Sequence, residues 1–484
     1  MNRTSLLTPL LMLATVHTAM AQAQFVPLDV GLGASIDRLD GQGAAAVGNQ
    51  GGEAMLLSLP CALQQLGVLP GYGGSVSSGV SNDGKSVVGT NFGSSANEQQ
   101  AFRWDAASGM VGLGLGLGLS SASAVSADGS VVVGITDSPA MPNQAFRWTQ
   151  ASGMEVLGPL PAGTFGAFAQ DVSADGLVIV GTASGQTGAS VQVFRWTAGT
   201  GMVSLGAGQQ PTVSGDGSVV VAGRLTGLCG FFSRTEATRW TAATGFVSLG
   251  MLPGDNSSLA VAVSEDGNTV LGVSRMCAMD NKPFLWTPSG GMVNLADHLS
   301  ALGATGMAGW QLNFPLDISA DGNAILGVGI NPSGAMQEWV AYLTPPPSGS
   351  IGTRYCSPAS ASSTGVPASL SATGSVSASD NDLTLTAGQL PPGQFGYFLA
   401  SQTQGMSVPA GSSGTLCLSG NIGRFNASGL IIQGPCGGID VELTAIPVNP
   451  TGMVLPGDTW NFQCWYRDMG NTSNFTDAVS ITFQ

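Results

Sequence analysis

The chain has 484 residues, which is more than one ordinary domain needs, and 72 of them are glycine. Only 9% of the residues are charged, and the net charge of −15 disfavours nucleic acid as a partner, because phosphate binding needs clustered Lys and Arg. The apolar fraction of 43% can build cores, so glycine between β-branched runs indicates an all-β protein and not disorder.

Residues 1–21 have the three parts of a secretory signal peptide. Arg3 precedes an apolar run from Leu6 to about Val16, and Ala19-Met20-Ala21 offers small residues for cleavage before Gln22. The apolar run is too short to cross a bilayer, and no later stretch is long and apolar enough to do so. The sequence therefore predicts cleavage near Ala21 and a secreted or periplasmic protein with no membrane span.

A degenerate repeat follows the leader. One copy contains Ala101-Phe102-Arg103-Trp104, then Gly109-Met110, then Ser126-Ala127-Asp128-Gly129 before a Val-Val-Val-Gly run. Asp-Gly pairs mark seven copies, with spacings of 43, 45, 47, 41, 50 and 55 residues. The aspartates are Asp40, Asp83, Asp128, Asp175, Asp216, Asp266 and Asp321. Four short apolar runs in each copy are what a four-stranded blade needs, so the repeat predicts a seven-bladed β-propeller.

The repeated residues have structural interpretations. Asp-Gly suits the hairpin between the first two strands of a blade, because Asp bonds its own turn and Gly accepts a positive φ. A ring of carboxylates could also bind calcium or sugars, but turn chemistry explains every copy. The Arg of Phe-Arg-Trp is present in only four copies, which favours salt bridging or blade-to-blade packing over a shared chemistry. The repeated tryptophans are predicted to be core: Trp104, Trp148, Trp196, Trp240 and Trp286.

The two ends of the repeat array complete each other. The last copy, which ends in Trp339-Val340-Ala341-Tyr342-Leu343, lacks a fourth strand, and residues 25–30 resemble a fourth strand without a blade. Pairing them would close the ring and remove the open sheet edges. We therefore expect a propeller over residues 25–344, with six or eight blades as alternatives if the Asp40 copy is not a blade.

The repeat also resembles a known family. The phrases Ala-Phe-Arg-Trp, Gly-Met-x-x-Leu-Gly and Val-Ser-Ala-Asp-Gly-Ser-Val-Val-Val-Gly, over roughly residues 75–330, resemble the bacterial extracellular HAF repeats. That resemblance implies a secreted, propeller-like protein. It implies no activity, substrate or catalytic residue.

A second domain follows a Pro/Ser/Gly linker at residues 345–350. Residues 351–484 hold short alternating strands without the repeat, and Trp460, Phe462, Cys464 and Tyr466 share one face by period-two spacing. Several such strands with Gly/Pro turns predict a β-sandwich. The stretches 394–401 and 460–468 resemble a C-terminal module of large secreted planctomycete and myxobacterial proteins, which implies export.

All seven cysteines follow the predicted cleavage site, so disulfides are expected. Cys229 and Cys277 occupy corresponding positions in neighbouring repeats and are predicted to form a bridge. The four cysteines of the second domain allow three pairings. We favour Cys417–Cys464, since both lie in strands, and Cys356–Cys436 by elimination, which leaves Cys61 over. Their spacing does not suit a zinc site.

The sequence offers little for catalysis. Past the leader the chain has one histidine, His298, so a Ser-His-Asp triad would depend on that residue alone. No cofactor is expected, although Asp380-Asn381-Asp382 could ligate calcium as well as form an Asx-rich turn. The longest loops, 222–236 and 297–311, are where a ligand is expected.

We predict a monomeric, non-catalytic binding or scaffold protein for a carbohydrate or a cell-surface or matrix partner. A polysaccharide hydrolase or lyase with acidic channel residues is the alternative.

Overall fold

The computed structural model describes residues 23–28, 34–59, 62–93, 98–114, 119–138, 141–185, 191–229, 232–277, 279–304, 306–344, 351–357, 359–363, 367–377, 383–391, 393–424, 430–432, 438–443, 454–468 and 472–484. The predicted signal peptide, the linker 345–350, Cys61, Cys436 and Asp380–Asp382 lie outside these ranges. None of the described helices is long and apolar enough to cross a membrane.

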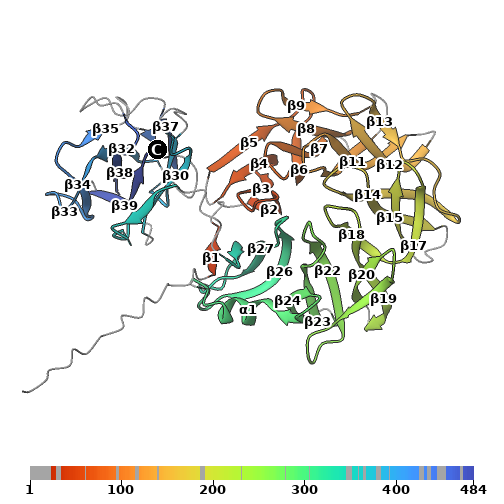
Figure 1. Cartoon of the computed structure of the whole chain (residues 1–484). Helices are drawn as coiled ribbons and strands as arrows, with labels where there is room; N and C mark the ends of the chain where they lie inside the picture. The colour runs from red at the N-terminus through yellow and green to blue at the C-terminus, as the bar shows by residue number, and fades with distance from the viewer. Residues whose placement is uncertain are drawn as a thin grey trace, which may run out of the picture.

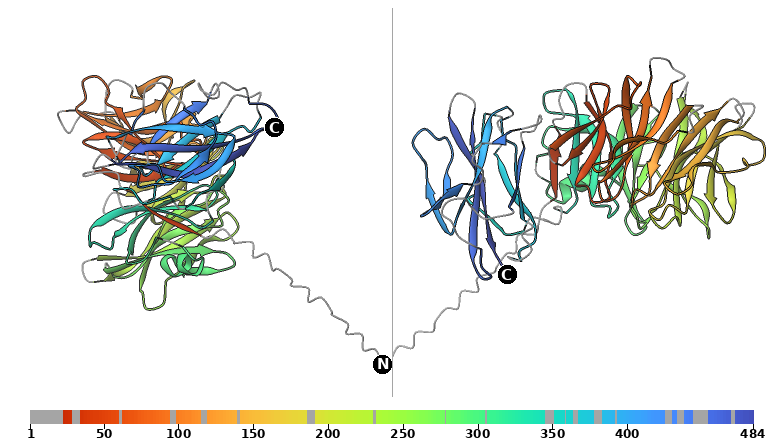
Figure 2. Two further views of the ribbon diagram at one scale, coloured as in Figure 1. Left: turned by 90° about the vertical axis from the view of Figure 1, so that its left-hand side faces the viewer. Right: turned by 90° about the horizontal axis from the view of Figure 1, so that it is seen from above.

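Seven four-stranded antiparallel sheets are arranged around a central axis (Figure 1). The strands run across the thickness of the disc, as the right-hand view of Figure 2 shows. The predicted seven-bladed propeller is therefore confirmed. The first three blades contain β2 (Ala34–Leu39), β3 (Ala45–Gln50), β4 (Glu53–Ser58) and β5 (Ala62–Gly67); β6 (Gly74–Val80), β7 (Ser86–Phe92), β8 (Gln99–Asp105) and β9 (Gly109–Gly112); and β10 (Leu119–Val125), β11 (Val131–Ser138), β12 (Met141–Thr149) and β13 (Gly153–Val156).

The remaining blades follow the same order from the axis outwards. They contain β14 (Thr164–Val172), β15 (Ile179–Gly185), β16 (Gln192–Thr197) and β17 (Gly201–Ala207); β18 (Gln209–Val213), β19 (Val219–Cys229), β20 (Phe232–Thr241) and β21 (Gly245–Gly250); β22 (Ser257–Val263), β23 (Val270–Met276), β24 (Met279–Thr287) and β25 (Gly291–Asn294); and β26 (Gln311–Ile318), β27 (Ala324–Ile330), β28 (Met336–Tyr342) and β1 (Gln24–Pro27). Helix α1 (Leu295–Ala301), which contains His298, precedes the last blade.

Strand β1 supplies the fourth strand of the seventh blade. Phe25 lies opposite Ala341 and Val26 opposite Val340, although these residues are more than 300 positions apart in the chain. The Phe25 ring packs against Trp310 and Trp339, with centroid separations of 5.1 and 5.5 Å. The first described strand thus pairs with the last repeat and closes the ring.

The cores of the propeller lie between neighbouring blades. One cluster joins Val131 and Val133 of the third blade to Ile179 and Phe194 of the fourth. Besides Trp339, the completely buried rings of the propeller belong to the Phe two positions before a repeated Trp: Phe102, Phe146, Phe194 and Phe284.

The prediction that the repeated tryptophans form the core needs correction. Only Trp104 is buried, whereas Trp148, Trp196, Trp240 and Trp286 are partly buried at the margins of the clusters. The Trp follows the buried Phe by two positions and therefore leans toward the same neighbour, but it lies nearer the end of the strand.

The glycine after each Val-rich run explains how the ring of Phe fits. Gly181 lies directly opposite Phe194. A Cβ atom at Gly181 would be 2.0 Å from the carbonyl oxygen of Phe168 and 2.7 Å from the Phe194 ring. The fifth blade has Ala222 at the corresponding position and Thr238 in place of Phe. Where the second strand of a blade has Ala in place of Gly, the third strand thus has the smaller Thr in place of Phe.

The C-terminal domain is a sandwich of two sheets around one core, as the sequence predicts. One sheet contains β29 (Thr353–Tyr355), β39 (Ser473–Thr482), β38 (Thr459–Arg467), β32 (Phe395–Ser401), β35 (Gly423–Arg424) and β36 (Leu430–Ile431); the other contains β30 (Ser369–Gly374), β31 (Leu383–Gly388) and β37 (Ile439–Leu443). Trp460, Phe462, Cys464 and Tyr466 all face the core between the sheets. A hairpin of β33 (Thr403–Ser407) and β34 (Leu416–Ser419) lies outside it.

Of the two segments predicted to be long loops, the first is mostly strand and the second begins in a helix. Residues 222–229 and 232–236 belong to β19 and β20, the longest hairpin of the propeller, whose rungs continue to Cys229 opposite Phe232. The segment 297–311 contains most of α1. The sequence predicts a loop at 222–236 because the other copies have no equivalent extension of the hairpin.

Candidate functional site in the central channel

The innermost strand of every blade lines a channel along the propeller axis. Each of these seven strands carries a β-bulge shortly before its Ser-x-Asp-Gly turn, or before the equivalent turn of the first blade. A bulge shifts the alternation of side chains, so the residues after it point differently from what a regular strand would give. The residues that follow these bulges form the wall of the channel.

The turns themselves form a second ring. The backbone N–H of the residue after the turn serine donates to the carbonyl oxygen of the same residue in the next blade. Six such links are present: from Asn82 to Ala127, Ala127 to Ala174, Ala174 to Gly215, Gly215 to Glu265, Glu265 to Ala320 and Ala320 to Gly41. The last of these crosses from the seventh blade to the first, so the ring of turns passes over the junction that β1 closes.

The turn aspartates have the predicted structural role in six blades. Asp175 Oδ1, for example, accepts from Ser173 Oγ at 2.6 Å and from the backbone N–H of Leu177 at 2.9 Å. The same pattern recurs at Asp83, Asp128, Asp216, Asp266 and Asp321. The glycine that follows has a φ of +69° at Gly176, as this turn requires.

Asp40 corrects the alignment of the first repeat. It occupies the position of the turn serine, because its Oδ1 accepts from Ala45 N at 3.0 Å as Ser81 Oγ accepts from Ser86 N at 2.9 Å. The positive-φ glycine of this turn is Gly43, not Gly41. A carboxylate can replace the hydroxyl as acceptor, so the predicted alignment placed the Asp-Gly pair of this turn two residues too early.

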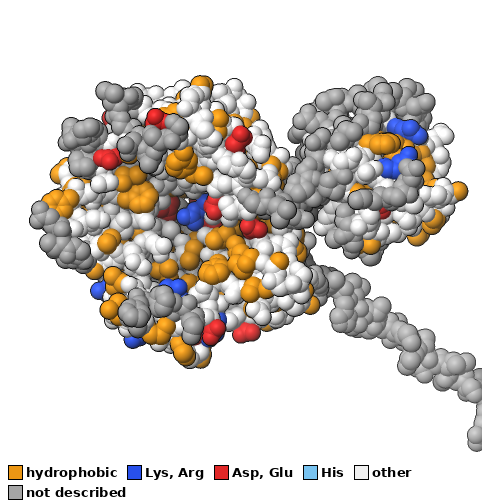
Figure 3. Space-filling model, turned by 180° about the vertical axis from the view of Figure 1, so that it is seen from behind, with side chains coloured by type: hydrophobic (Ala, Val, Ile, Leu, Met, Phe, Trp, Pro, Cys, Tyr) orange, Lys and Arg blue, Asp and Glu red, His pale blue; other side chains and the backbone are white. Residues whose placement is uncertain are grey.

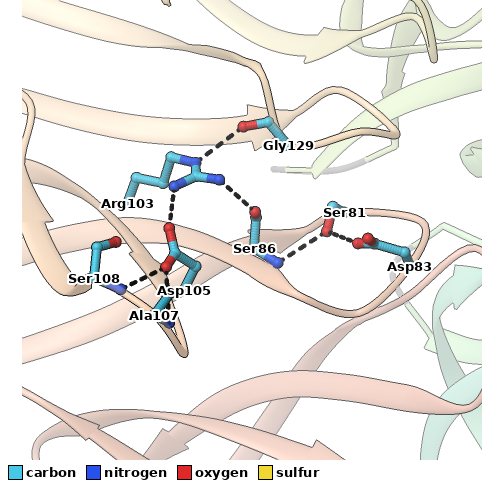
Figure 4. A network of polar contacts seen from close by, with 8 residues as sticks. All are labelled: Ser81, Asp83, Ser86, Arg103, Asp105, Ala107, Ser108 and Gly129. Atoms are coloured by element: carbon cyan, nitrogen blue, oxygen red, sulfur yellow. Dashed lines mark hydrogen bonds and ion pairs between the residues drawn. The ribbon is translucent and has the colours of Figure 1, made fainter. Parts of the chain in front are cut away.

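The arginine of the repeat joins neighbouring blades. Arg103 Nε donates to the carbonyl oxygen of Gly129 in the turn of the next blade at 2.9 Å, and its other nitrogens bond Ser86 and Asp105 (Figure 4). Arg195 and Arg239 bond Gly217 and Gly267 of the next blade in the same way. Blade-to-blade packing is thus the role of this arginine.

Polar residues interrupt the otherwise small lining of the channel. Two positions before the turn serine, three blades have Gly or Ala, and the others have Arg38, Asp171, Thr212 and Asp317. Together with Gln170 they line a cavity of about 160 Å³ that all seven innermost strands surround. Acidic and basic side chains gather at the hollow in the middle of the propeller (Figure 3).

Asp171 and Asp317 use their carboxylates in the same way. Asp171 Oδ2 accepts from Val213 N in the next blade at 2.8 Å, and Oδ1 accepts from Val172 N at 2.8 Å. Asp317 Oδ2 accepts from Leu39 N of the first blade at 2.9 Å, and its Oδ1 accepts from Ile318 N. Each carboxylate therefore fastens one blade to the next and still borders the channel.

The channel holds opposite charges close together. Arg38 Nη1 lies 3.9 Å from Asp317 Oδ1 and donates to the carbonyl oxygen of Leu316 at 3.2 Å. Burial raises the pKa of Asp171 to about 6, because the backbone N–H donors and the charge of Arg38 only partly offset the loss of water. Burial also raises the pKa of Asp317, against the effect of Arg38.

Two polar atoms of the cavity wall have no hydrogen-bond partner among the described residues. Gln170 Oε1 and Thr212 Oγ1 are both inaccessible to solvent and unpaired, although both residues border the cavity. An unpaired buried polar group costs free energy, so these two side chains are costly to the fold. Gln170 and Thr212 are not part of any repeated phrase, and their proximity depends on the packing of the fourth blade against the fifth. The sequence pattern therefore did not single them out.

The cysteines agree with one prediction and contradict another. Cys229 and Cys277 form the predicted bridge, with 5.6 Å between their Cα atoms. The second bridge joins Cys356 to Cys417, so the predicted pairs Cys417–Cys464 and Cys356–Cys436 are wrong. Cys464 is a buried free thiol.

The reason is the face of β38 on which each side chain lies. Cys464 points into the sandwich core, whereas Gln463 points to the other face and its Oε1 accepts from Cys417 N at 2.8 Å. Cys417 is therefore on the face opposite to the Cys464 side chain. Disulfides persist in oxidising compartments, so the two bridges favour a location outside the cytoplasm.

No group of three or more His, Cys, Asp or Glu side chains that suits a metal ion occurs within the described ranges. His298 lies on α1, where its carbonyl oxygen accepts from Leu302 N, and it is not among the residues that line the cavity.

These features define a closed propeller with a polar constriction in its channel, and comparison with solved structures finds other propellers. The chain is 14% identical to TolB from Acinetobacter baumannii (TM-score 0.36), over 64% of this chain and 79% of TolB. It is 12% identical to an oligogalacturonate lyase from Vibrio parahaemolyticus (TM-score 0.42), over 67% and 98% of the two chains. It is 13% identical to a prolyl endopeptidase (TM-score 0.41), covering 76% of this chain and 54% of the peptidase.

Similarities at this level bear on the fold alone. No protein-family model matches the sequence, and no curated protein matches it either.

Proposed function

We propose that this chain is an exported, non-catalytic binding protein whose propeller channel binds a carbohydrate group. The observation that carries the proposal is the polar lining of the cavity on the axis, to which Arg38, Gln170, Asp171 and Thr212 contribute. The same proposal includes the predicted signal peptide with cleavage near Ala21, a monomeric state and a relation to the HAF-type repeats.

The mixture of groups in the cavity supports a hydroxyl-rich ligand. A hydroxyl both donates and accepts hydrogen bonds, so it suits a lining that mixes carboxylates, a guanidinium and the side chains of Gln and Thr. The cavity of about 160 Å³ is also small beside the sites that bind drug-sized ligands, which favours a single sugar unit.

A polysaccharide hydrolase or lyase is the second candidate. The raised pKa of Asp171, about 6, favours it, because a carboxyl that is partly protonated near neutral pH can act as a general acid. Against it, both oxygens of Asp171 and both oxygens of Asp317 accept backbone N–H groups. These hydrogen bonds use both carboxylates to hold neighbouring blades together, so binding without turnover is the better supported function.

The test replaces two channel residues with the residues that other blades have at the same positions. Blades two and three have serine at the position of Gln170, and blades three and six have alanine at the position of Thr212, so Gln170→Ser with Thr212→Ala should keep the fold. A glycan array on the mature protein identifies the sugar, and calorimetry compares the affinities. We expect the double variant to lose about tenfold or more in affinity. The control is Gln64→Ser, the same change on the exposed outer strand β5.

Two results would contradict the proposal. One is a double variant that binds the sugar as tightly as the unaltered protein, and the other is an array with no binding at all. Turnover separates the two candidate functions: degradation of a polysaccharide by the mature protein that disappears in Asp171→Asn would establish the enzyme.

A further inference from the structure

The outer face of the larger sandwich sheet carries a second cluster with the chemistry of a ligand site. Phe395 and Tyr397 of β32 and Trp465 of β38 point away from the core, because Gly396, Phe398 and Tyr466, their neighbours in the chain, face the other way. The β33–β34 hairpin covers the other end of this face, where Leu399, Leu418 and Phe475 are buried together. Phe395 remains 39% exposed.

Two arginines extend the aromatic rings into a stack. The rings of Tyr397 and Trp465 are stacked, with centroids 4.6 Å apart and an interplanar angle of 21°. The guanidinium of Arg424 lies 4.6 Å from the Tyr397 centroid, on β35 beside β32. That of Arg467 lies 5.8 Å from Trp465 and 5.7 Å from Phe395. Stacking on Tyr397 holds the Arg424 guanidinium plane in place and leaves the edge of that plane available to a ligand.

The charge of this cluster stands out from its surroundings. Residues 351–484 contain only three cationic residues, Arg354, Arg424 and Arg467, and the whole chain has a net charge of −15. Arg354 is neutralised by Asp477, with Nε and Oδ2 at 3.1 Å. Within the described part of the chain, Arg424 has no carboxylate partner. Basic side chains lie together with exposed hydrophobic ones on this domain in Figure 3.

We propose that Arg424, Tyr397, Trp465, Phe395 and Arg467 form a second binding site, for the carboxylate groups of an acidic polysaccharide. A guanidinium edge binds a carboxylate through two parallel hydrogen bonds. The faces and edges of aromatic rings pack against the C–H groups of a sugar ring. A polyuronate offers carboxylates and C–H surfaces in alternation along its length, as the stack offers guanidinium groups and rings. The overall negative charge opposes nucleic acid as the occupant.

This site is separate from the channel, although the choice of a saccharide as its ligand rests on the proposed function. Its test uses the full mature chain with three polymers: alginate, which carries carboxylates, dextran sulfate, which carries sulfates, and neutral dextran. We expect binding to alginate that weakens with salt and little binding to dextran. Arg424→Gln should lower the affinity for alginate about tenfold, through the loss of a charge-assisted bond. Arg424→Lys should recover only part of it, because lysine lacks the planar fork.

The control is Arg224→Gln, which removes the same charge from an exposed position of β19 and should leave alginate binding unchanged. The proposal is overturned if the mature protein does not bind alginate, if dextran sulfate binds as tightly, or if Arg424→Gln binds like the control. The channel variant Gln170→Ser with Thr212→Ala should keep its alginate binding. If that variant loses alginate and Arg424→Gln does not, the polysaccharide site is the channel and not the sandwich.

Discussion

The propeller and the sandwich stabilise their sheets by different means. In the propeller each device occurs in several copies: the Ser–Asp turn, the Gly opposite Phe, and the arginine that reaches the next turn. In the sandwich the devices are single, such as the Cys356–Cys417 bridge and the Arg354–Asp477 ion pair. In a repeat, comparison of the copies identifies each position whose residue differs from its equivalents. Once the structure aligns the innermost strands, the polar residues of the channel differ in this way, whereas the sandwich has no repeat against which a residue could be compared.

Breaking a repeated packing pair should have the largest effect. Gly181→Ala would place a Cβ against the Phe168 carbonyl oxygen and the Phe194 ring, so we expect a loss of about 4 kcal/mol in the free energy of unfolding. Denaturant titration measures it. Gly199→Ala is the control, because a Cβ there meets no atom within 4 Å. A destabilisation of Gly199→Ala equal to that of Gly181→Ala would contradict the packing argument.

The single bridge of the sandwich should matter nearly as much to its own domain. Cys356→Ser opens a link across 61 residues of sequence and should cost about 3 kcal/mol, chiefly through the unfolded chain. Cys464→Ala should leave both bridges intact, since its thiol is free. Peptide mapping without reduction checks the pairing directly, and a peptide that joins Cys417 to Cys464 would refute it.

The repeated turns should make the propeller sensitive to acid. Hydrogen bonds from the turn serine lower the pKa of Asp83, Asp216 and Asp266, and at Asp105 those from Ser108, with the charge of Arg103, lower the pKa to about 2. A lowered pKa contributes stability above the unfolded value, near 4, that disappears as the pH falls toward the folded value. The melting temperature should therefore drop between about pH 4 and pH 2. Asp105→Asn should flatten that drop; an unchanged profile would argue against it.

The channel carboxylates should behave in the opposite sense, with a smaller effect. Burial raises the pKa of Asp171 to about 6, so its stabilising contribution is complete below the unfolded value near 4 and is lost as the pH rises through about 6. Asp171→Asn should remove this part of the pH dependence between pH 4 and pH 7. A melting profile over that range that is identical in the variant would show that Asp171 titrates normally.

Much of the fold could be predicted from the sequence because the same pattern of strands and turns occurs in several copies. The Asp-Gly turns, the blade number and the closing strand all came from comparing copies. The innermost strands were harder: their bulges break the period-two alternation, and only the closed ring brings Asp171 near Asp317 and Arg38. Cys417 was paired wrongly because a strand pattern does not say which sheet face a neighbouring hairpin covers. Asp40 was misaligned because a carboxylate can replace the turn serine.

The closed ring is the claim on which the channel and its ligand depend, and a cross-link tests it most directly. Val26 lies opposite Val340 in the structure, so Val26→Cys with Val340→Cys should form a disulfide on mild oxidation, found by peptide mapping, and should raise the melting temperature. Val26→Cys with Val132→Cys, in the third blade, should not cross-link. Failure of the first pair to join, or equal joining of both, would contradict the closure of the propeller by its first strand.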